Sequence, residues 1–124
     1  MLMMRAFILP AALVAGIPFL AVTPTAHAAE MVTYEVISSE IATADVEYND
    51  LSGRITRTQV ALPWRTNATV GNPFTKDAEL QAHWQSKPAY WVTLRVYFRG
   101  SPLCQKILDE GNGTCYGRWS HRPI

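Results

Sequence analysis

The feature that most constrains the fold of this chain is a strict two-residue alternation of apolar and polar side chains. It is clearest over residues 90–98, and it recurs over residues 32–36 and 44–48. Successive side chains of an extended strand point to opposite faces, so this period predicts strands with one buried and one exposed face. The buried face of the clearest run is expected to hold Tyr90, Val92, Leu94, Val96 and Phe98.

Turn signals separate the alternating runs roughly every eight to twelve residues, a spacing typical of all-β sandwiches. Asn49–Gly53 and Glu110–Gly113 are rich in glycine, asparagine and aspartate, which accept positive φ. In the first turn we expect Gly53 to supply that geometry and Asp50 to accept a local Asx hydrogen bond. The predicted fold is therefore all-β, an immunoglobulin-like β-sandwich of about seven strands, with a small barrel as the alternative. Thr75–Gln85 fits both a strand and one helical turn.

The tripeptide Leu62-Pro63-Trp64 ends one of the predicted strands. Proline cannot donate to a ladder, so Pro63 marks a strand end or an edge, and Trp64 begins the next segment. One interpretation is a sandwich corner, where the chain changes sheet and Trp64 plugs the open end of the core. The other is an exposed aromatic platform that contacts a lipid, a glycan or another protein.

Residues 1–28 have the order of parts expected of an export signal. Arg5 supplies a positive charge, residues 6–22 are almost entirely apolar, and Ala26-His27-Ala28 matches an A-x-A cleavage signature. We predict a signal peptide over 1–28 and a β-sandwich domain over 29–124, secreted or held in the periplasm or cell envelope. The alternative is an uncleaved single-pass anchor with the domain still outside the cytoplasm, because the apolar run is at the short limit of a bilayer span.

Cys104 and Cys115 are the two cysteines of the chain, and we predict that they form a disulfide bond. Export to an oxidising compartment favours the pairing. They flank the turn at Glu110–Gly113, so we expect the bond to join neighbouring strands of one hairpin. By loop-closure entropy such a bond would add about 2 to 3 kcal/mol to the stability.

Composition and residue spacing argue against nucleic-acid binding and against catalysis. The eleven basic and ten acidic residues nearly balance, and no basic patch is evident. Neither His83 nor His121 has metal-ligand spacing with another histidine or with the cysteines. Asp45 and Glu47 share one face of a predicted strand, where we expect them to be solvated. We therefore predict a non-enzymatic protein without a catalytic residue, a cofactor or a metal site.

Four short motifs resemble, in their order and spacing, the MmpS family of mycobacteria and their relatives. They are Val32–Val36 (VTYEV), Ala44–Asp50 (ADVEYND), Gly53 and Val60–Trp64 (VALPW). The later alternating strand and the paired cysteines near the C-terminus are also similar to that family. The resemblance covers most of residues 29–124.

The resemblance implies an extracytoplasmic immunoglobulin-like sandwich with no catalytic residues. It also implies an accessory role beside MmpL transporters of the resistance–nodulation–division superfamily, which export lipids, glycolipids and siderophores. Family members are typically held by an uncleaved N-terminal transmembrane helix, whereas Ala26-His27-Ala28 predicts cleavage in this chain. The alternative function is therefore a free secreted interaction or structural domain that recognises a cell-wall or host component.

Trp64, Trp91 and Tyr97 form the candidate interaction surface, for a transporter or for an amphipathic lipid or siderophore cargo. Trp91 and Tyr97 alternate with the expected core residues of 90–98 and so lie on the opposite face. If exposed, they would form an aromatic patch of the kind that marks an interaction surface. Burial of both faces of a central strand would explain the same pattern.

Overall fold

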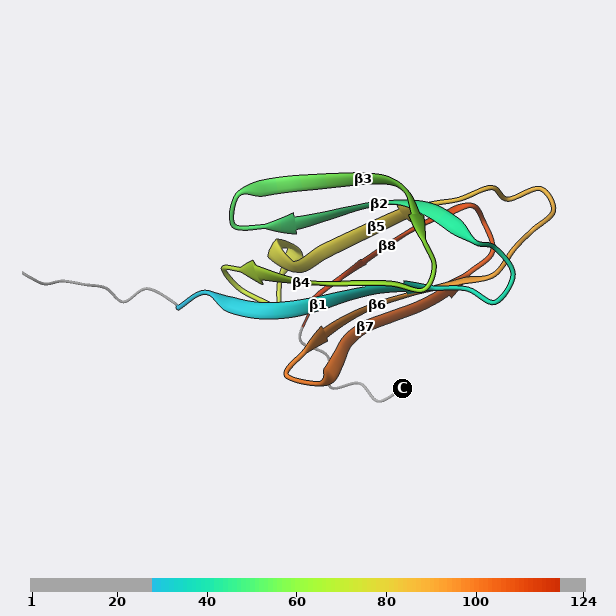
Figure 1. The fold of residues 1–124 in the computed structure, drawn as a ribbon. Helices are drawn as coiled ribbons and strands as arrows, with labels where there is room; N and C mark the ends of the chain where they lie inside the picture. Colours follow the sequence, from blue (N-terminus) through green and yellow to red (C-terminus); the bar gives the residue numbers. More distant parts are fainter. Residues whose placement is uncertain (1–27, 119–124) are drawn as a thin grey trace, which may run out of the picture.

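The computed structural model describes residues 28–118 and shows two antiparallel four-stranded sheets packed face to face (Figure 1). One sheet, the β1 sheet, has the order β4-β1-β6-β7, and the other, the β2 sheet, has the order β3-β2-β5-β8. The strands are β1 (Glu30–Ile37), β2 (Thr43–Asp50), β3 (Gly53–Ala61), β4 (Trp64–Val70), β5 (Glu79–His83), β6 (Val92–Phe98), β7 (Ser101–Leu108) and β8 (Asn112–Tyr116). The prediction of an all-β sandwich is confirmed, with eight strands in place of about seven.

The eighth strand comes from the segment that fitted both a strand and a helical turn. Thr75 caps a single 3-10 turn, η1 (Lys76–Ala78), because its hydroxyl oxygen accepts a 3.1 Å hydrogen bond from the backbone N–H of Asp77. β5 follows at once, and its Leu80 and Ala82 are fully buried. The segment is therefore a helical turn in its first part and a strand in its second.

The core lies between the two sheets and is built by the alternation visible in the sequence. On β6, the expected residues Val92, Leu94 and Val96 are buried. Tyr90 and Phe98, at the two ends of the run, are partly buried and pack against the core. The largest fully buried side chains come from both sheets: Tyr34, Leu80, Leu94, Val32, Val36, Val46, Val70, Val92, Val96 and Cys115. Burial raises the pKa of the Tyr34 hydroxyl, which donates a 2.7 Å hydrogen bond to the carbonyl oxygen of Asn49.

The chain passes from the β2 sheet to the β1 sheet at Leu62 and Pro63, between β3 and β4. The N–H of Leu62 donates a 2.8 Å hydrogen bond to the carbonyl oxygen of Ala42, which fastens this corner to the β1–β2 connection. Trp64 begins β4, and its ring lies 5.6 Å from that of Tyr48, centroid to centroid. The Trp64 ring is therefore partly buried against the core.

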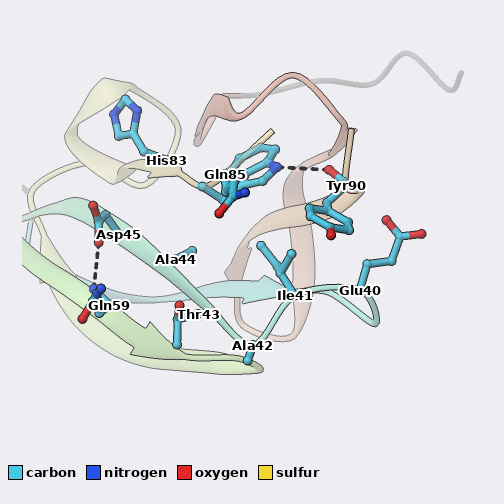
Figure 2. A pocket seen from close by; sticks show the side chains of 11 residues that line it. Glu40, Ile41, Ala42, Thr43, Ala44, Asp45, Gln59, His83, Gln85 and Tyr90 are labelled. Carbon is cyan, nitrogen blue, oxygen red and sulfur yellow. Dashed lines mark hydrogen bonds between the residues drawn. The ribbon is translucent and has the colours of Figure 1, made fainter. Parts of the chain in front are cut away.

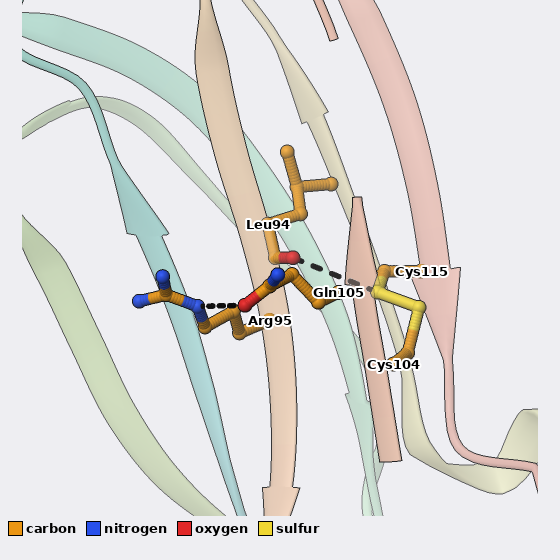
Figure 3. The surroundings of a disulfide bond; sticks show 5 residues. All are labelled: Leu94, Arg95, Cys104, Gln105 and Cys115. Carbon is orange, nitrogen blue, oxygen red and sulfur yellow. Dashed lines mark hydrogen bonds between the residues drawn. A yellow bond between two sulfur atoms is a disulfide. The ribbon is translucent and has the colours of Figure 1, made fainter. Parts of the chain in front are cut away.

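The disulfide between Cys104 and Cys115 forms, but it does not lie within a hairpin, so that part of the prediction is wrong. Cys104 is on β7, which pairs with β6, whereas Cys115 is on β8, which pairs with β5 in the other sheet (Figure 3). The bond joins the two sheets with the Cα atoms 5.8 Å apart. Residues 109–111 carry the chain across the sandwich instead of folding β8 beside β7. A Cβ atom at Gly113 would collide with Leu108, so glycine permits this close approach.

Residues 1–27, which carry nearly all of the predicted signal peptide, lie outside the described residues. β1 begins at Glu30, directly after the predicted boundary between signal peptide and domain. Within residues 28–118, no helix is long and apolar enough to cross a membrane.

Candidate functional site

The three aromatic residues of the candidate surface do not come together in the fold. Trp64 faces the core at the β3–β4 corner. Trp91 directly precedes β6 and is 50% exposed, and Tyr97 lies near the other end of the same strand. Trp91 and Tyr97 are six positions apart in extended chain, which corresponds to roughly 20 Å. The candidate surface therefore divides into separate parts, and Trp91 is the most accessible of the three.

Two hydrogen bonds hold the backbone of Trp91 against the β1–β2 connection. Its N–H donates to the carboxylate Oε1 of Glu40 at 2.6 Å, and its carbonyl oxygen accepts from the hydroxyl of Ser38 at 2.8 Å. The Ser38 oxygen also accepts from the backbone N–H of Glu40 at 3.0 Å, which ties the two contacts together. The backbone of Trp91 is therefore anchored while half of its surface remains exposed.

Two isoleucines extend the apolar surface around Trp91. Thr93 on β6 lies directly opposite Ile37 on β1 and Ile107 on β7, so the three share the outer face of the β1 sheet. Exposed Trp91 and buried Val92 continue the alternation, which places Trp91 on the same outer side. Ile107 is 55% exposed. We name this surface, made of Ile37, Trp91 and Ile107, the Trp91 patch.

Tyr97 lies within a polar network on the same outer face. Its hydroxyl donates a 3.2 Å hydrogen bond to Glu35, whose carboxylate also lies 3.0 Å from Arg95 and 3.6 Å from Arg65. The hydrogen bond to Glu35 raises the pKa of the Arg95 guanidinium. Arg95 donates a further 2.6 Å bond to Gln105 on β7 (Figure 3). Tyr97 is thus held in a network whose members lie on four strands, β4, β1, β6 and β7, and it is less suited than Trp91 to meet a partner.

The outer face of the β2 sheet has an arginine at the centre of its network. Arg54 on β3 lies 3.1 Å from Glu47 and 2.8 Å from Glu79, and it donates to the side chains of Asn49 and Gln81 at 3.0 and 2.8 Å. One guanidinium therefore connects β3, β2 and β5. Glu47, which we expected to be solvated, is 34% exposed and is also paired with Arg54.

A groove of about 560 Å³ opens beside Tyr90, where the β1–β2 and β5–β6 connections meet (Figure 2). Glu40 lies at one end of the groove and Asp45 at the other. Trp84 is buried behind it and donates its indole N–H to the carbonyl oxygen of Tyr90 at 3.0 Å. Sequence reasoning did not find this groove, because its walls come from segments about 40 residues apart in the chain.

The turn residues of the candidate set stabilise the β2–β3 hairpin. The side chain and the backbone N–H of Ser52 donate to the Oδ1 atom of Asp50 at 2.6 and 2.7 Å. These bonds, led by that from the Ser52 side chain, lower the pKa of the Asp50 carboxyl. Gly53 has a φ of 122°, a value that suits glycine. Asp50, Gly53 and Pro63 therefore have structural positions, away from the Trp91 patch.

Metal-ligating side chains do not cluster in the described part of the chain. Residues 28–118 contain no group of three or more histidine, cysteine or acidic side chains that could hold a metal ion. The Asp45 carboxylate accepts a 2.7 Å hydrogen bond from the N–H of Gln59, which has a positive φ where β3 bulges. The described residues thus offer an apolar patch on the outer face of the β1 sheet and, apart from it, a polar groove at one end of the sandwich. The chain matches no protein-family model and no curated protein.

Proposed function

We propose that this domain is a non-enzymatic binding module that acts outside the cytoplasm, as an accessory to MmpL-type export of lipids or siderophores. The observation that carries the proposal is Trp91, a residue half exposed while two hydrogen bonds hold its backbone in place. The resemblance of VTYEV, ADVEYND and VALPW to the MmpS family supplies the transporter and its cargo.

The energetics of the Trp91 patch support binding. A large apolar side chain that passes from water into an interface contributes about 1.5 to 3 kcal/mol when fully buried. Tryptophan is among the residues that most often dominate interfaces. Because the backbone of Trp91 is already ordered, binding loses less conformational entropy than at a mobile loop. Ile107 and Ile37 extend the area that a partner would cover.

The disulfide supports the proposed location. Structural disulfides persist in oxidising compartments and are rare in the reducing cytosol. The Cys104–Cys115 bond joins the two sheets, so the architecture itself includes an oxidised pair.

Site-specific photo-crosslinking in the native cell tests the proposal. A photoreactive residue in place of Trp91 should crosslink to a large multispanning transporter, or to an amphipathic cargo identified by mass spectrometry. The matched control places the same residue at Thr58, which is exposed on edge strand β3 of the other sheet. Equal crosslinking from both positions, or none from position 91, would contradict the proposal.

The N-terminus of the purified protein distinguishes the accessory role from the alternative, a free secreted interaction domain. Mass spectrometry of the exported chain would read its first residue. A start at Ala29 together with recovery from the medium favours the free domain. Retention of Met1 together with recovery in the membrane fraction favours the tethered accessory. In the first case the crosslinked partner is expected to be a cell-wall or host component.

A further inference from the structure

We propose that the free edge of β4 binds an extended segment of a protein partner, which adds to the β1 sheet as a fifth strand. The segment is expected to carry an acidic side chain that meets Arg57. The inference goes beyond the proposed function, because β4 is the edge of the β1 sheet farthest from Ile107 on β7. Strand addition of this kind obtains its affinity from main-chain hydrogen bonds.

The backbone of β4 has hydrogen-bonding groups that point away from the sheet. The carbonyl oxygen of Thr69 accepts a 2.9 Å hydrogen bond from the N–H of Leu51 in the β2–β3 turn, so this oxygen points away from β1. Successive residues of an antiparallel strand direct their N–H and C=O groups to opposite edges. The same groups of Arg65 and Asn67 therefore also point outward, and no group of residues 28–118 bonds to them. They form two free positions of the ladder.

Among the four edges of the two described sheets, β4 has the least protection against pairing. β3 is interrupted by a bulge, where Gln59 has a positive φ. β7 contains Pro102 and a register shift, and β8 has five residues and lies against β7, since Gly113 approaches Leu108. Proline, bulges and short length are the means by which natural sheets prevent pairing at an edge. β4, by contrast, pairs with β1 over all seven residues without a shift.

The β2 sheet extends over the position beside β4. Across the sandwich β4 packs against β2, and β3 continues the β2 sheet one strand further. Ile55, Arg57 and Val60 lie opposite inward-facing residues of β2, so they belong to the inner face of the sheet. Ile55 and Val60 are only partly buried, and Arg57 is exposed. The inner side of β3 is thus incompletely covered, and a strand beside β4 would cover it.

Charge and shape select the occupant. Among the ion pairs of residues 28–118, none includes Arg57, which lies between Ile55 and Val60 on the inner side of β3. A strand whose inward side chains are apolar, acidic and apolar in turn would match these three residues. A second sandwich that paired with β4 edge to edge would bring its own β2 sheet against β3. The position beside β4 therefore suits a single extended segment and not a second copy of this domain.

An NMR titration of the purified exported protein tests the inference with a defined peptide, acetyl-Val-Thr-Asp-Thr-Val-amide. The peptide should produce saturable shifts in the amides of residues 65–67 and 55–60. The control peptide is N-methylated at the aspartate and at the following threonine, which removes donors from both of its edges. It should bind at least tenfold more weakly, because the main-chain bonds are lost. Equal binding of the two peptides, or shifts confined to other residues, would overturn the inference.

Matched variants at one position separate the backbone from the side chain. Asn67→Pro removes the outward N–H and leaves the ladder with β1 intact, as proline does at an edge. It should weaken the peptide at least tenfold, whereas Asn67→Ala keeps the N–H and should leave the affinity within about twofold. Thermal unfolding checks that both variants retain the fold. Unchanged affinity in folded Asn67→Pro would overturn the inference.

A second variant tests the acidic side chain without altering β4. Arg57→Gln should weaken the aspartate peptide about threefold, as expected for an exposed ion pair. The same variant should leave unchanged the affinity of the peptide that carries asparagine in place of aspartate. Unchanged binding of the aspartate peptide to Arg57→Gln would overturn the match to Arg57. This measurement also decides the matter if Asn67→Pro does not fold.

Analytical ultracentrifugation tests the other occupant, a second copy. The native protein should sediment as a monomer at the concentrations of the titration. A dimer that Asn67→Pro dissociates would show that two β4 edges pair with each other, and would overturn the inference. The two proposals can fail separately. Loss of the peptide result leaves the partner crosslinked at residue 91 in place, and absence of that partner leaves the peptide result in place.

Discussion

On the outer face of the β1 sheet, Glu35 lies between Arg65 and Arg95, whereas on the outer face of the β2 sheet Arg54 lies between Glu47 and Glu79. Both faces thus join three strands through one central charged group, with the signs of charge reversed. The Glu35 side chain is the more enclosed of the acidic partners, at 13% exposed against 34% for Glu47.

The two faces differ more in their apolar residues than in their charges. Three of the exposed large apolar side chains of residues 28–118 belong to the β1 sheet or its entry, namely Met31, Trp91 and Ile107. The fourth, Leu51, lies in the β2–β3 turn. Because the central charges of both faces, Glu35 and Arg54, are already paired, the gain on binding comes mainly from covering apolar surface. On the basis of this comparison we propose that the β1 sheet faces a partner and that the β2 sheet faces solvent.

The largest expected effect is in the core that both sheets share. Leu94→Ala and Leu80→Ala remove fully buried side chains from the β1 and β2 sheets respectively. Each should lower the free energy of unfolding by about 2 to 5 kcal/mol, because each leaves a cavity. Denaturant unfolding measures both. If only one variant lowers the free energy of unfolding, the two sheets do not share one core, and the comparison of their outer faces does not hold.

The next effect concerns the bond between the sheets. Replacing both Cys104 and Cys115 by alanine should lower the free energy of unfolding by about 3 kcal/mol, through the added entropy of the unfolded chain. Reduction of the native protein should give a similar loss in the same denaturant assay. A variant as stable as the native protein would contradict the role assigned to the bond.

A smaller effect separates the two charged networks. Glu35→Gln leaves two arginines without their acidic partner in a more enclosed position, so it should cost about 1 kcal/mol of stability. Glu47→Gln removes one of two acidic partners from Arg54 at a more exposed site, and it should cost less than about 0.5 kcal/mol. Thermal unfolding at low salt compares the pair. An equal or reversed order would show that enclosure does not distinguish the faces.

The smallest effect on stability is expected at Trp91. Trp91→Ala should change the free energy of unfolding by less than about 0.5 kcal/mol, because the residue is half exposed on the outside of the sandwich and the backbone bonds remain. Capture of the envelope partner should nevertheless fall at least tenfold, as for a central interface residue. Thr58→Ala is the matched surface control in both assays. A destabilised variant, or one that captures the partner normally, would contradict the assignment of the patch.

The local sequence pattern was sufficient to predict the strands and the residues of the core. The alternation over residues 90–98 predicts which side chains of β6 are buried, since one face of a strand must meet the other sheet. Thr75–Gln85 stayed ambiguous because a capped 3-10 turn and a short strand follow each other within it.

Long-range arrangement could not be predicted from the same pattern. The glycine-rich stretch Glu110–Gly113 suits a hairpin turn as well as a crossing between sheets, and only the pairing of β8 with β5 decides between them. The two isoleucines of the Trp91 patch were missed for a similar reason. Ile37 and Ile107 lie on either side of Thr93 because of the register of three strands. No local sequence pattern indicates that register.

Hydroxyl-radical footprinting of the protein in its native envelope tests the central claim most directly. Mass spectrometry would compare side-chain oxidation in the envelope with that of the purified protein. If the β1 sheet faces a partner, Trp91 and Ile107 should be oxidised several-fold less in the envelope, while Leu51 and Tyr116 should be oxidised to the same extent in both samples. Unchanged oxidation of Trp91 and Ile107, with protection of Leu51 and Tyr116, would contradict the account.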